Sequence, residues 1–504
     1  MGDGIRISEF AASLRCADPI GMLRNGLIGD GIAVPGPLGP RPLVYADHVA
    51  SGRAVRQVEF FVSERVLPFY ANSHTEASFC GQAMTELRRE ARTVVAQHCG
   101  ADSRHATIFA GAGATAGLNR LVPLLGVAEE AGAGRRPLVV IGPYEHHSNI
   151  LPWRESGAEV VEIPEAGCGG PDLAVLEEVL VRETTGPAGD GRLVVGAFSA
   201  ASNVTGIVTD ADAVSAVLKR HGALAVWDYA CGAPYLPIDM RAGTPFEKDA
   251  VVFSGHKLVG GPGASGVLVV RKAAVRRERP SLAGGGTVRF VSPWGHDFAV
   301  DLEKREEAGT PDVIGDIRVA LCLEVKAAIG QDRMDRRHAE LVARARARWE
   351  THPEIELLGN PAARKRLPIF AFRVRNRRNG GFVHPQLVTR LLSDLHGIQA
   401  RGGCACAGPY AHRLLGIDAA GSAALRNAIL AGDEMSKPGW TRLNLSALHG
   451  DDKVGFILDA VCGLGRDAER WAGRYVADGS TARFRLGGAG DPATQVEPSA
   501  AAAA

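Results

Sequence analysis

AVVFSGHKLVGGPGASGVLVV, residues 250–270, joins two short apolar runs through a glycine-rich loop. The runs AVVF and GVLVV are rich in β-branched residues, which is typical of strands buried on both faces of a sheet. Lys257 follows the first run, and ligands of parallel sheets bind at the carboxyl ends of strands. Lys257 is therefore either an ordinary loop lysine or a Schiff-base lysine, which needs partial desolvation to be nucleophilic.

Five more apolar runs precede this stretch, and longer segments with helical spacing of apolar residues separate them, such as 76–99 and 210–222. This alternation predicts an α/β fold with one large, mostly parallel seven-stranded sheet flanked by helices. The five upstream strands are predicted at ATIFA (106–110), LVVIG (138–142), EVVEI (159–163), LVVGAF (193–198) and ALAVWD (223–228).

The pattern changes near residue 306 to long charged helices, including 331–350, followed by a strand at 367–374 and a helix near 385–396. This change predicts a second, smaller α+β domain. The predicted organisation is an N-terminal segment that joins the small domain (1–45), a large domain (46–305), a small C-terminal α+β domain (306–465) and a partly flexible tail (466–504).

Composition excludes several classes of protein. The 504 residues are 46% hydrophobic and only 22% charged, so the chain is globular rather than disordered. The 57 basic and 56 acidic residues nearly cancel, so no overall field favours nucleic acid or an anionic membrane. No apolar run reaches the length of a membrane span, and nine scattered cysteines fit a reducing compartment. We expect a cytoplasmic protein that binds neither nucleic acid nor membrane, and no metal site.

Asp228 ends an otherwise apolar strand and precedes Lys257 by one or two strands. Alone, such an aspartate is usually a helix cap. Paired with the lysine it suits pyridoxal 5'-phosphate (PLP), where a carboxylate keeps the pyridinium nitrogen protonated and the ring an electron sink.

The glycine-rich turn FAGAGATAGLN (109–119) lies between a predicted strand and a helix. Free backbone N–H groups in such a turn can bind a phosphate, with Thr115 as a hydroxyl donor. Its glycines lack the GxGxxG spacing, and no acidic residue ends a strand about 20 positions later, so PLP is favoured over a nicotinamide cofactor. A tight turn that simply requires glycine is the alternative.

YEHHSNILPW (144–153) directly follows the predicted strand LVVIG and places Glu145, His146 and His147 at the same sheet edge. An imidazole there can stack on a cofactor ring and exchange protons near neutral pH. A metal pair is disfavoured because no further ligand cluster lies nearby. Purely structural histidines remain the alternative.

ARGGCACAGPY (400–410) contains Cys404 and Cys406 between glycines, after Arg401. The glycines indicate an exposed loop, in which a thiolate favoured by nearby positive charge can act as a nucleophile. Buried, inert cysteines are the alternative.

These motifs occur together in one order: EHHSNILPW, SNVTG (202–206), the strand ending in Asp228, SGHKLVGGPGASGVL, EAGTP (307–311) and the RGGCACA loop. In this order they resemble the fold-type I PLP enzymes of aminotransferase class V, and most of all the group II cysteine desulfurases and selenocysteine lyases. The likeness spans roughly residues 40–465.

The resemblance implies a role for each matching residue. Lys257 resembles the lysine that binds PLP covalently, Asp228 the pyridinium partner and His146 the ring-stacking histidine. Arg442 in TRLNLS resembles the arginine that binds a substrate carboxylate with its bidentate fork. The implied cofactor-binding residues are Lys257, Asp228, His146, Ala114, Thr115, Asn203, Ser254, His256, Cys231 and Thr310, and the implied substrate-binding residues are Arg442, Arg401, Asn203 and His74.

The resemblance also implies an activity. L-Cysteine would lose its sulfur to Cys406 as a persulfide and leave as alanine, with Lys257 and His146 moving protons and a sulfur-acceptor protein as partner. Thr310 resembles a threonine that reaches the phosphate of a neighbouring subunit, which implies a homodimer. A different PLP reaction on another amino acid, as a lyase or aminotransferase, remains the alternative, and a binding protein without catalysis is a third.

Three departures from the family pattern bear on these expectations. Cys231 stands where the family commonly has a glutamine that bonds the cofactor's phenolic oxygen. Cys404 and Ala405 replace residues that are often histidines. The spacing between Cys406 and Arg442, residues 407–441, is longer than in the compact family pattern.

Overall fold

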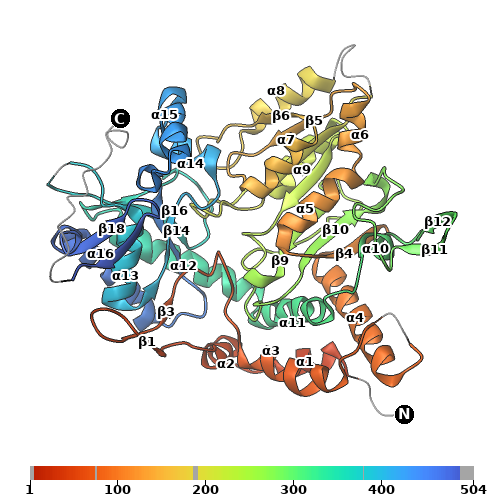
Figure 1. The fold of residues 1–504 in the computed structure, drawn as a ribbon, viewed down its shortest axis with the longest axis horizontal. Coiled ribbons are helices and arrows are strands. Elements are labelled where there is room, and N and C mark those ends of the chain that lie inside the picture. The colour runs from red at the N-terminus through yellow and green to blue at the C-terminus, as the bar shows by residue number, and fades with distance from the viewer. Residues whose placement is uncertain (1–4, 74–75, 185–190, 379, 489–504) are drawn as a thin grey trace. The chain divides into compact units, whose positions relative to one another are not determined.

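The computed structural model describes residues 5–73, 76–184, 191–378 and 380–488 (Figure 1). The chain forms two compact units, which are described separately. Unit 1 comprises residues 1–28, 50–202 and 208–334, and unit 2 comprises residues 29–49, 203–207 and 335–504. No helix in the described ranges is long and apolar enough to cross a membrane.

Unit 1 is built on a seven-stranded sheet in the order β4-β10-β9-β8-β7-β5-β6, flanked by helices (Figure 1). Neighbouring strands from β6 to β9 are parallel, and β10 runs antiparallel to both β9 and β4. All seven predicted strands are confirmed: β4 (His105–Gly111), β5 (Leu138–Ile141), β6 (Glu159–Glu162), β7 (Val194–Ser199), β8 (Leu224–Asp228), β9 (Ala250–Ser254) and β10 (Gly266–Arg271).

Helices cover this sheet because its strands carry apolar residues on both faces. Helix α5 (Gly113–Leu124) packs on β4, β9 and β10, and α9 (Ala211–Arg220) packs on β8. Helices α4 (Phe79–His98) and α11 (Val313–Ile329) lie against each other (Figure 1). The core between α5 and the sheet includes Leu118, Leu121, Val139, Val195, Val226, Val252 and Leu268, each no more than 1% exposed.

A hairpin and a short helix follow β10 in unit 1. The hairpin β11 (Val288–Ser292) and β12 (Gly295–Phe298) is antiparallel and largely exposed. Helix α10 (Leu302–Glu306) follows it and precedes EAGTP. The remaining helices of the unit are α1 (Ile7–Ser13), α2 (Pro19–Gly26), α3 (Arg56–Phe61), α6 (Val127–Gly132), α7 (Leu151–Glu155) and α8 (Leu173–Thr184).

Unit 2 holds an antiparallel sheet in the order β13-β14-β17-β16, formed by Ile355–Leu357, Ile369–Val374, Trp440–Asn444 and Arg401–Gly403. Helices α12 (Gln331–Trp349, which begins in unit 1), α13 (Pro385–His396) and α16 (Asp451–Ala472) supply the apolar partners of its core, among them Trp349, Leu391 and Val461. The predicted α+β pattern of this part of the chain, with its strand near 367–374 and helix near 385–396, is present. Its other elements are β1 (Ala33–Val34), β2 (Arg41–Pro42), β3 (Val44–Tyr45), β15 (Ile398–Gln399), α14 (Gly408–Leu415), α15 (Ala419–Leu430), β18 (Tyr475–Asp478) and β19 (Arg483–Leu486).

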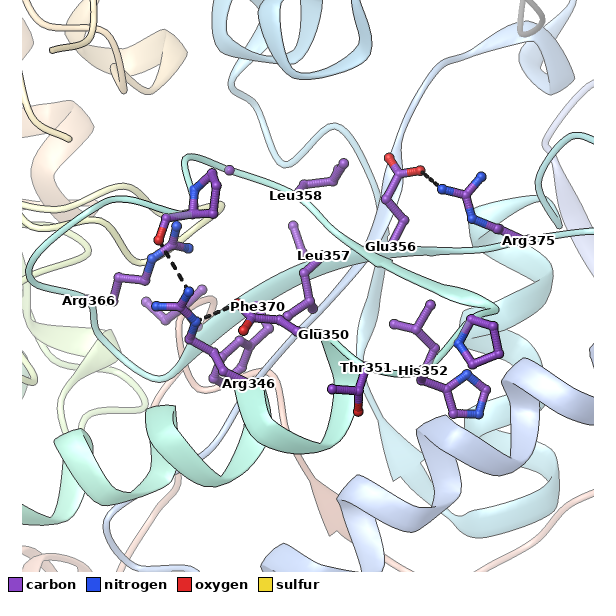
Figure 2. A pocket seen from close by; sticks show the side chains of 16 residues that line it. Arg346, Glu350, Thr351, His352, Glu356, Leu357, Leu358, Arg366, Phe370 and Arg375 are labelled. Atoms are coloured by element: carbon purple, nitrogen blue, oxygen red, sulfur yellow. Dashed lines mark hydrogen bonds and ion pairs between the residues drawn. The ribbon is translucent and has the colours of Figure 1, made fainter. Parts of the chain in front are cut away.

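A cavity of about 470 Å³ in unit 2 lies along β13, the start of β14 and the end of α12 (Figure 2). Four of its charged side chains form two pairs: Arg346 bonds Glu350, and Arg375 bonds Glu356 at 3.0 Å. None of the predicted site residues lines this cavity. We therefore place no chemistry of the predicted reaction in it.

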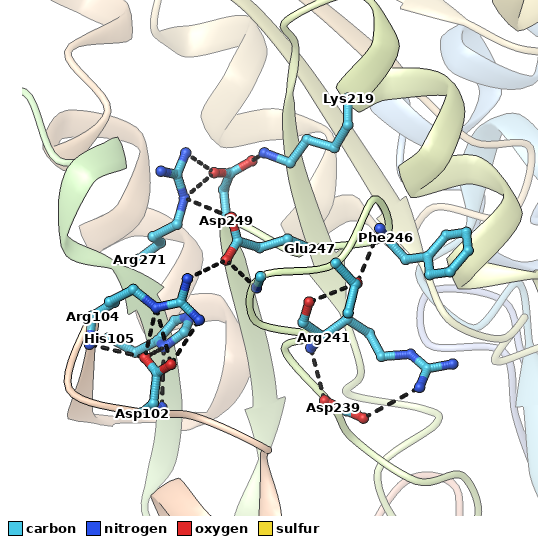
Figure 3. Close-up of polar contacts among 12 residues, drawn as sticks. Asp102, Arg104, His105, Lys219, Asp239, Arg241, Phe246, Glu247, Asp249 and Arg271 are labelled. Atoms are coloured by element: carbon cyan, nitrogen blue, oxygen red, sulfur yellow. Dashed lines mark hydrogen bonds and ion pairs between the residues drawn. The ribbon is translucent and has the colours of Figure 1, made fainter.

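The opposite end of β9 from Lys257 is held by a buried carboxylate, Asp249, whose side chain has no exposed surface (Figure 3). Asp249 accepts hydrogen bonds from Arg271 Nε at 2.7 Å and from the Ala225 N–H at 2.8 Å, and it pairs with Lys219. This cluster lies at the amino end of the strand, so it anchors the sheet rather than the predicted site.

Replacing Asp249 by asparagine keeps the shape of the side chain and removes its charge. Lys219 then loses its counter-charge and Arg271 loses the nearer of its two, since Glu247 remains 3.8 Å from Arg271 Nε. Breaking a buried pair in this way costs about 3 kcal/mol. Thermal unfolding should begin at a clearly lower temperature in Asp249→Asn than in Asp102→Asn, which removes an exposed carboxylate in the same region (Figure 3). Equal midpoints for the two variants would contradict this role.

Candidate functional site

Asp228 and Lys257 lie at the carboxyl ends of neighbouring parallel strands in unit 1. Asp228 is the last residue of β8, and its register partner on β9 is Val252, two residues before that strand ends. Lys257 closes the short 3₁₀ turn Gly255–Lys257 after β9 and is half-buried. Both residues therefore lie at the sheet edge where ligands of parallel sheets bind.

Asp228 is a buried carboxylate whose charge is only partly compensated. It accepts a hydrogen bond from the Ala230 N–H at 2.7 Å and makes no ion pair within the described ranges. Burial raises the pKa of Asp228, and the positive charge of Lys257 opposes that rise. A cationic ring nitrogen bound beside Asp228 would supply the missing counter-charge.

A candidate phosphate cradle lies where β4 turns into α5. The first residue of α5, Gly113, has φ +67°, and a Cβ there would come within 2.9 Å of Ser254 Oγ and 3.1 Å of His256 Cε1. The Ala114 N–H donates to Ser254 Oγ at 2.9 Å, and Thr115 is exposed at the helix N-terminus. Glycine is thus required for the close approach, and the turn collects N–H, hydroxyl and imidazole groups that suit a phosphate.

The loop after β5 carries His146, which caps the 3₁₀ turn His147–Asn149. His146 Nδ1 accepts from the Ser148 N–H at 3.1 Å, and Ser148 Oγ lies 2.7 Å from Thr115 Oγ1. Ser148 therefore connects the predicted ring-stacking histidine to the phosphate cradle. Burial lowers the pKa of the neighbouring His147, with Arg154 as a smaller cause.

Glu145 connects this histidine loop to the end of β7. Its carboxylate is buried and accepts hydrogen bonds from the Ser199 N–H and hydroxyl, both at 2.7 Å, and from Asn149 Nδ2 at 2.5 Å. Burial raises the pKa of Glu145 to about 7, and the charge of Asp228 adds to the rise. The sequence predicts that Glu145 lies at this edge but indicates no role for it.

This raised pKa predicts a pH dependence of stability. Between pH 4.5 and pH 7 the unfolded state releases the Glu145 proton and the folded state retains it, so stability falls as pH rises through this window. In Glu145→Gln the dependence is absent, and the free energy of unfolding of the wild type should fall relative to the variant by up to about 3 kcal/mol. Urea unfolding of both proteins across the window measures this change. A difference that stays constant with pH would contradict it.

In unit 2, Arg442 lies on β17 directly opposite Arg401 on β16. Asp47 separates these two positive charges: it accepts from Arg442 Nη2 at 2.8 Å and from Arg401 Nε at 3.0 Å. Arg442 Nη1 donates to the Asn203 carbonyl at 3.0 Å. Asp47 is a site residue that sequence analysis missed, because no local pattern predicts a pair separated by 395 positions.

Two buried polar atoms of this cluster have no hydrogen-bond partner among the described residues: Arg442 Nε and Asn203 Oδ1. Buried groups of this kind are normally paired, so an unpaired donor and an unpaired acceptor point to a polar ligand. A substrate carboxylate is an acceptor that suits Arg442.

The thiol loop begins where β16 ends, beside the strand that carries Arg442. Cys406 is exposed and Cys404 is half-buried. Asn203 Nδ2 donates to the Ala405 carbonyl at 2.9 Å, which ties the loop to the Arg442 cluster within unit 2. Neither cysteine is buried, so the alternative of two buried, inert cysteines is wrong.

Three predicted site residues remain: Cys231, Thr310 and His74. Cys231 is buried after β8, with Sγ 3.6 Å from the Ser202 carbonyl. Thr310 is exposed and makes no hydrogen bond with another predicted site residue in the described part of unit 1. His74 falls outside the described residues.

Comparison with known proteins defines the class. Residues 44–429 match the aminotransferase class-V family. The chain is 30% identical over 376 residues to a probable cysteine desulfurase of Streptomyces coelicolor, covering 74% of this chain and 85% of the relative. It is 28% identical over 372 residues to a probable cysteine desulfurase of Halalkalibacterium halodurans, covering 73% and 85%.

A solved structure shows the same fold. The apo structure of a cysteine desulfurase from Thermococcus onnurineus NA1 superposes with a TM-score of 0.68 at 25% identity, covering 84% of this chain and 95% of that one. The chain belongs to the aminotransferase class-V family, whose members are PLP-dependent enzymes.

Proposed function

We propose that this protein is a PLP-dependent cysteine desulfurase that takes sulfur from L-cysteine onto Cys406 and releases alanine. The observation that carries the proposal is the exposed thiol turn that directly follows β16, the strand paired with the strand of Arg442. Its relatives named as cysteine desulfurases support the same activity.

The residues of unit 1 fit PLP. The N-terminus of α5, Thr115, Ser254 and His256 would hold the phosphate, and Asp228 would hold the ring nitrogen. Bound PLP supplies an electron sink for the carbanion that forms when the substrate loses its Cα proton. Lys257 is the residue that we assign to covalent attachment and to removal of that proton, and we assign His146 to ring stacking and proton exchange.

The family resemblance assigns the remaining roles to residues of unit 2. Arg442, with Asn203 and Arg401 in its cluster, would bind the substrate carboxylate. The Cys406 thiolate would attack the substrate sulfur, so that the carbon–sulfur bond breaks and a sulfur–sulfur bond forms on Cys406. The carbon skeleton then takes up one proton at Cβ, regains a proton at Cα and leaves as alanine.

A second candidate is a different PLP reaction, a lyase or an aminotransfer on another amino acid. The ion pair between Arg442 and Asp47 supports this second candidate, because it occupies part of the guanidinium that the desulfurase needs for the substrate carboxylate. Product analysis of PLP-loaded protein with L-cysteine and a reductant separates the two. Alanine with sulfide supports the desulfurase, whereas pyruvate with ammonia, or no turnover despite bound PLP, contradicts it.

We further propose a cytoplasmic homodimer with a sulfur-acceptor protein as partner. Thr310 is exposed in its own unit. The β11–β12 hairpin, which precedes it in the sequence, exposes Phe290 and Trp294, the latter 93% exposed. Exposed apolar side chains of this size are typical of a binding surface. Sedimentation should give twice the mass of the 53.0 kDa chain, and a monomer would contradict the dimer.

A further inference from the structure

The two cysteines of the thiol loop belong to one tight turn. The Ala407 N–H donates to the Cys404 carbonyl at 3.2 Å, which closes a four-residue turn over 404–407. Its two central residues, Ala405 and Cys406, have φ +53° and +54°. Positive φ at both positions defines a type I′ turn, which normally contains glycine, asparagine or aspartate. The turn is therefore kept in a strained conformation.

Contacts on both sides hold this strained turn in place. Asn203 Nδ2 donates to the Ala405 carbonyl at 2.9 Å. Gly403 ends β16 before the turn, and Ala407 is the N-cap of α14 after it. Cys406 thus lies at the amino end of α14, where the helix dipole favours negative charge.

The bend of this turn makes a disulfide between its two cysteines geometrically possible. Consecutive Cα atoms are about 3.8 Å apart, so two residues separated by one position lie at most about 7.6 Å apart and closer in a bent chain. Disulfides join Cα atoms roughly 4.4 to 6.8 Å apart. No other two of the nine cysteines lie so close in the sequence.

We propose that Cys404 is the resolving thiol of the loop. This inference rests on the proposed function, which loads Cys406 with a sulfane sulfur. The Cys404 thiolate attacks the Cys406 sulfur that is bonded to Cβ, the persulfide bond breaks, and the outer sulfur leaves as hydrosulfide. A Cys404–Cys406 disulfide remains, and a dithiol reductant returns it to two thiols.

The electrons of this sequence balance. Removal of sulfur from L-cysteine as alanine leaves one sulfur at the zero-valent level on Cys406. The two loop thiols supply the two electrons that reduce this sulfur to sulfide, and they are themselves oxidised to the disulfide. A disulfide in so small and exposed a loop is readily reduced, which suits regeneration by a dithiol.

A reductant-free single turnover tests this. The holoenzyme is reduced, desalted and given one equivalent of L-cysteine, and then alanine, sulfide and intact mass are measured. The wild type should release about one sulfide for each alanine and lose two hydrogens, with Cys404 and Cys406 in one cross-linked peptide. Cys404→Ser and Cys404→Ala should form the same alanine, release about tenfold less sulfide and retain one extra sulfur. Cys168→Ser, which removes an exposed cysteine elsewhere, should behave as the wild type.

The possible outcomes distinguish the resolving role of Cys404 from the desulfurase activity on which it rests. Alanine with a retained extra sulfur and no sulfide in the wild type would overturn the resolving role and leave the desulfurase intact. Sulfide release that survives in both Cys404 variants would also overturn it. Absence of alanine in every protein would contradict the desulfurase and this inference together.

Discussion

Replacement of Lys257 by alanine should give a folded protein that carries no covalent PLP and makes no alanine from L-cysteine. Lys257 is half-buried at the end of β9, where the charge of Asp228 acts on it. No other lysine combines a strand end with this environment in the described parts of the sheet. We expect activity to fall by about 10³-fold or more, because both the attachment and the proton transfer are lost.

Borohydride reduction followed by intact-mass measurement tests for covalently attached PLP without relying on activity. The wild type should gain the mass of one reduced PLP, and Lys257→Ala should gain none. Lys272→Ala is the matched control, because Lys272 is exposed and donates only to the Ser103 carbonyl. PLP that remains covalently attached in Lys257→Ala would show that another lysine carries the cofactor.

Replacement of Cys406 by serine should leave PLP bound and remove alanine formation. A serine hydroxyl is a far weaker nucleophile toward sulfur than a thiolate, and it cannot carry a persulfide. We expect alanine production from L-cysteine to fall by about 10²-fold or more. Because Cys406 is exposed on a turn, the substitution should not change the thermal midpoint.

The control for Cys406→Ser is again Cys168→Ser, which should retain full activity. The absorbance of bound PLP in both variants confirms that the cofactor site is intact. A fully active Cys406→Ser variant would exclude Cys406 as the sulfur carrier and favour a lyase, whose reaction needs Lys257 and Asp228 but no nucleophilic thiol.

The sheet of unit 1 was predictable from sequence because its strands are buried on both faces. Runs such as LVVIG and GVLVV are continuous apolar segments, and each became a strand within one or two residues of its expected position. The apolar runs do not indicate that β10 is antiparallel to its neighbours. This direction follows from the short GGPGASG connection, which cannot hold a crossover helix.

The candidate site was predictable only where its residues follow strands. Asp228, Ser254 and Lys257 end or follow β8 and β9, so their common edge follows from a parallel sheet. The bond between Asp47 and Arg442 joins distant parts of the chain, and composition carries no signal of it. The turn that holds Cys404 and Cys406 also escaped prediction, since alanine and cysteine are not residues that mark a type I′ turn.

The measurement that tests the central claim most directly follows the sulfur atom itself. Cys404→Ser holoenzyme, which keeps Cys406 but has no second thiol in the loop, is given one equivalent of L-cysteine with isotopically heavy sulfur and no reductant. The account predicts one heavy sulfur on the Cys406 peptide for each alanine formed. Pyruvate in place of alanine, or an unlabelled Cys406 peptide, would contradict it.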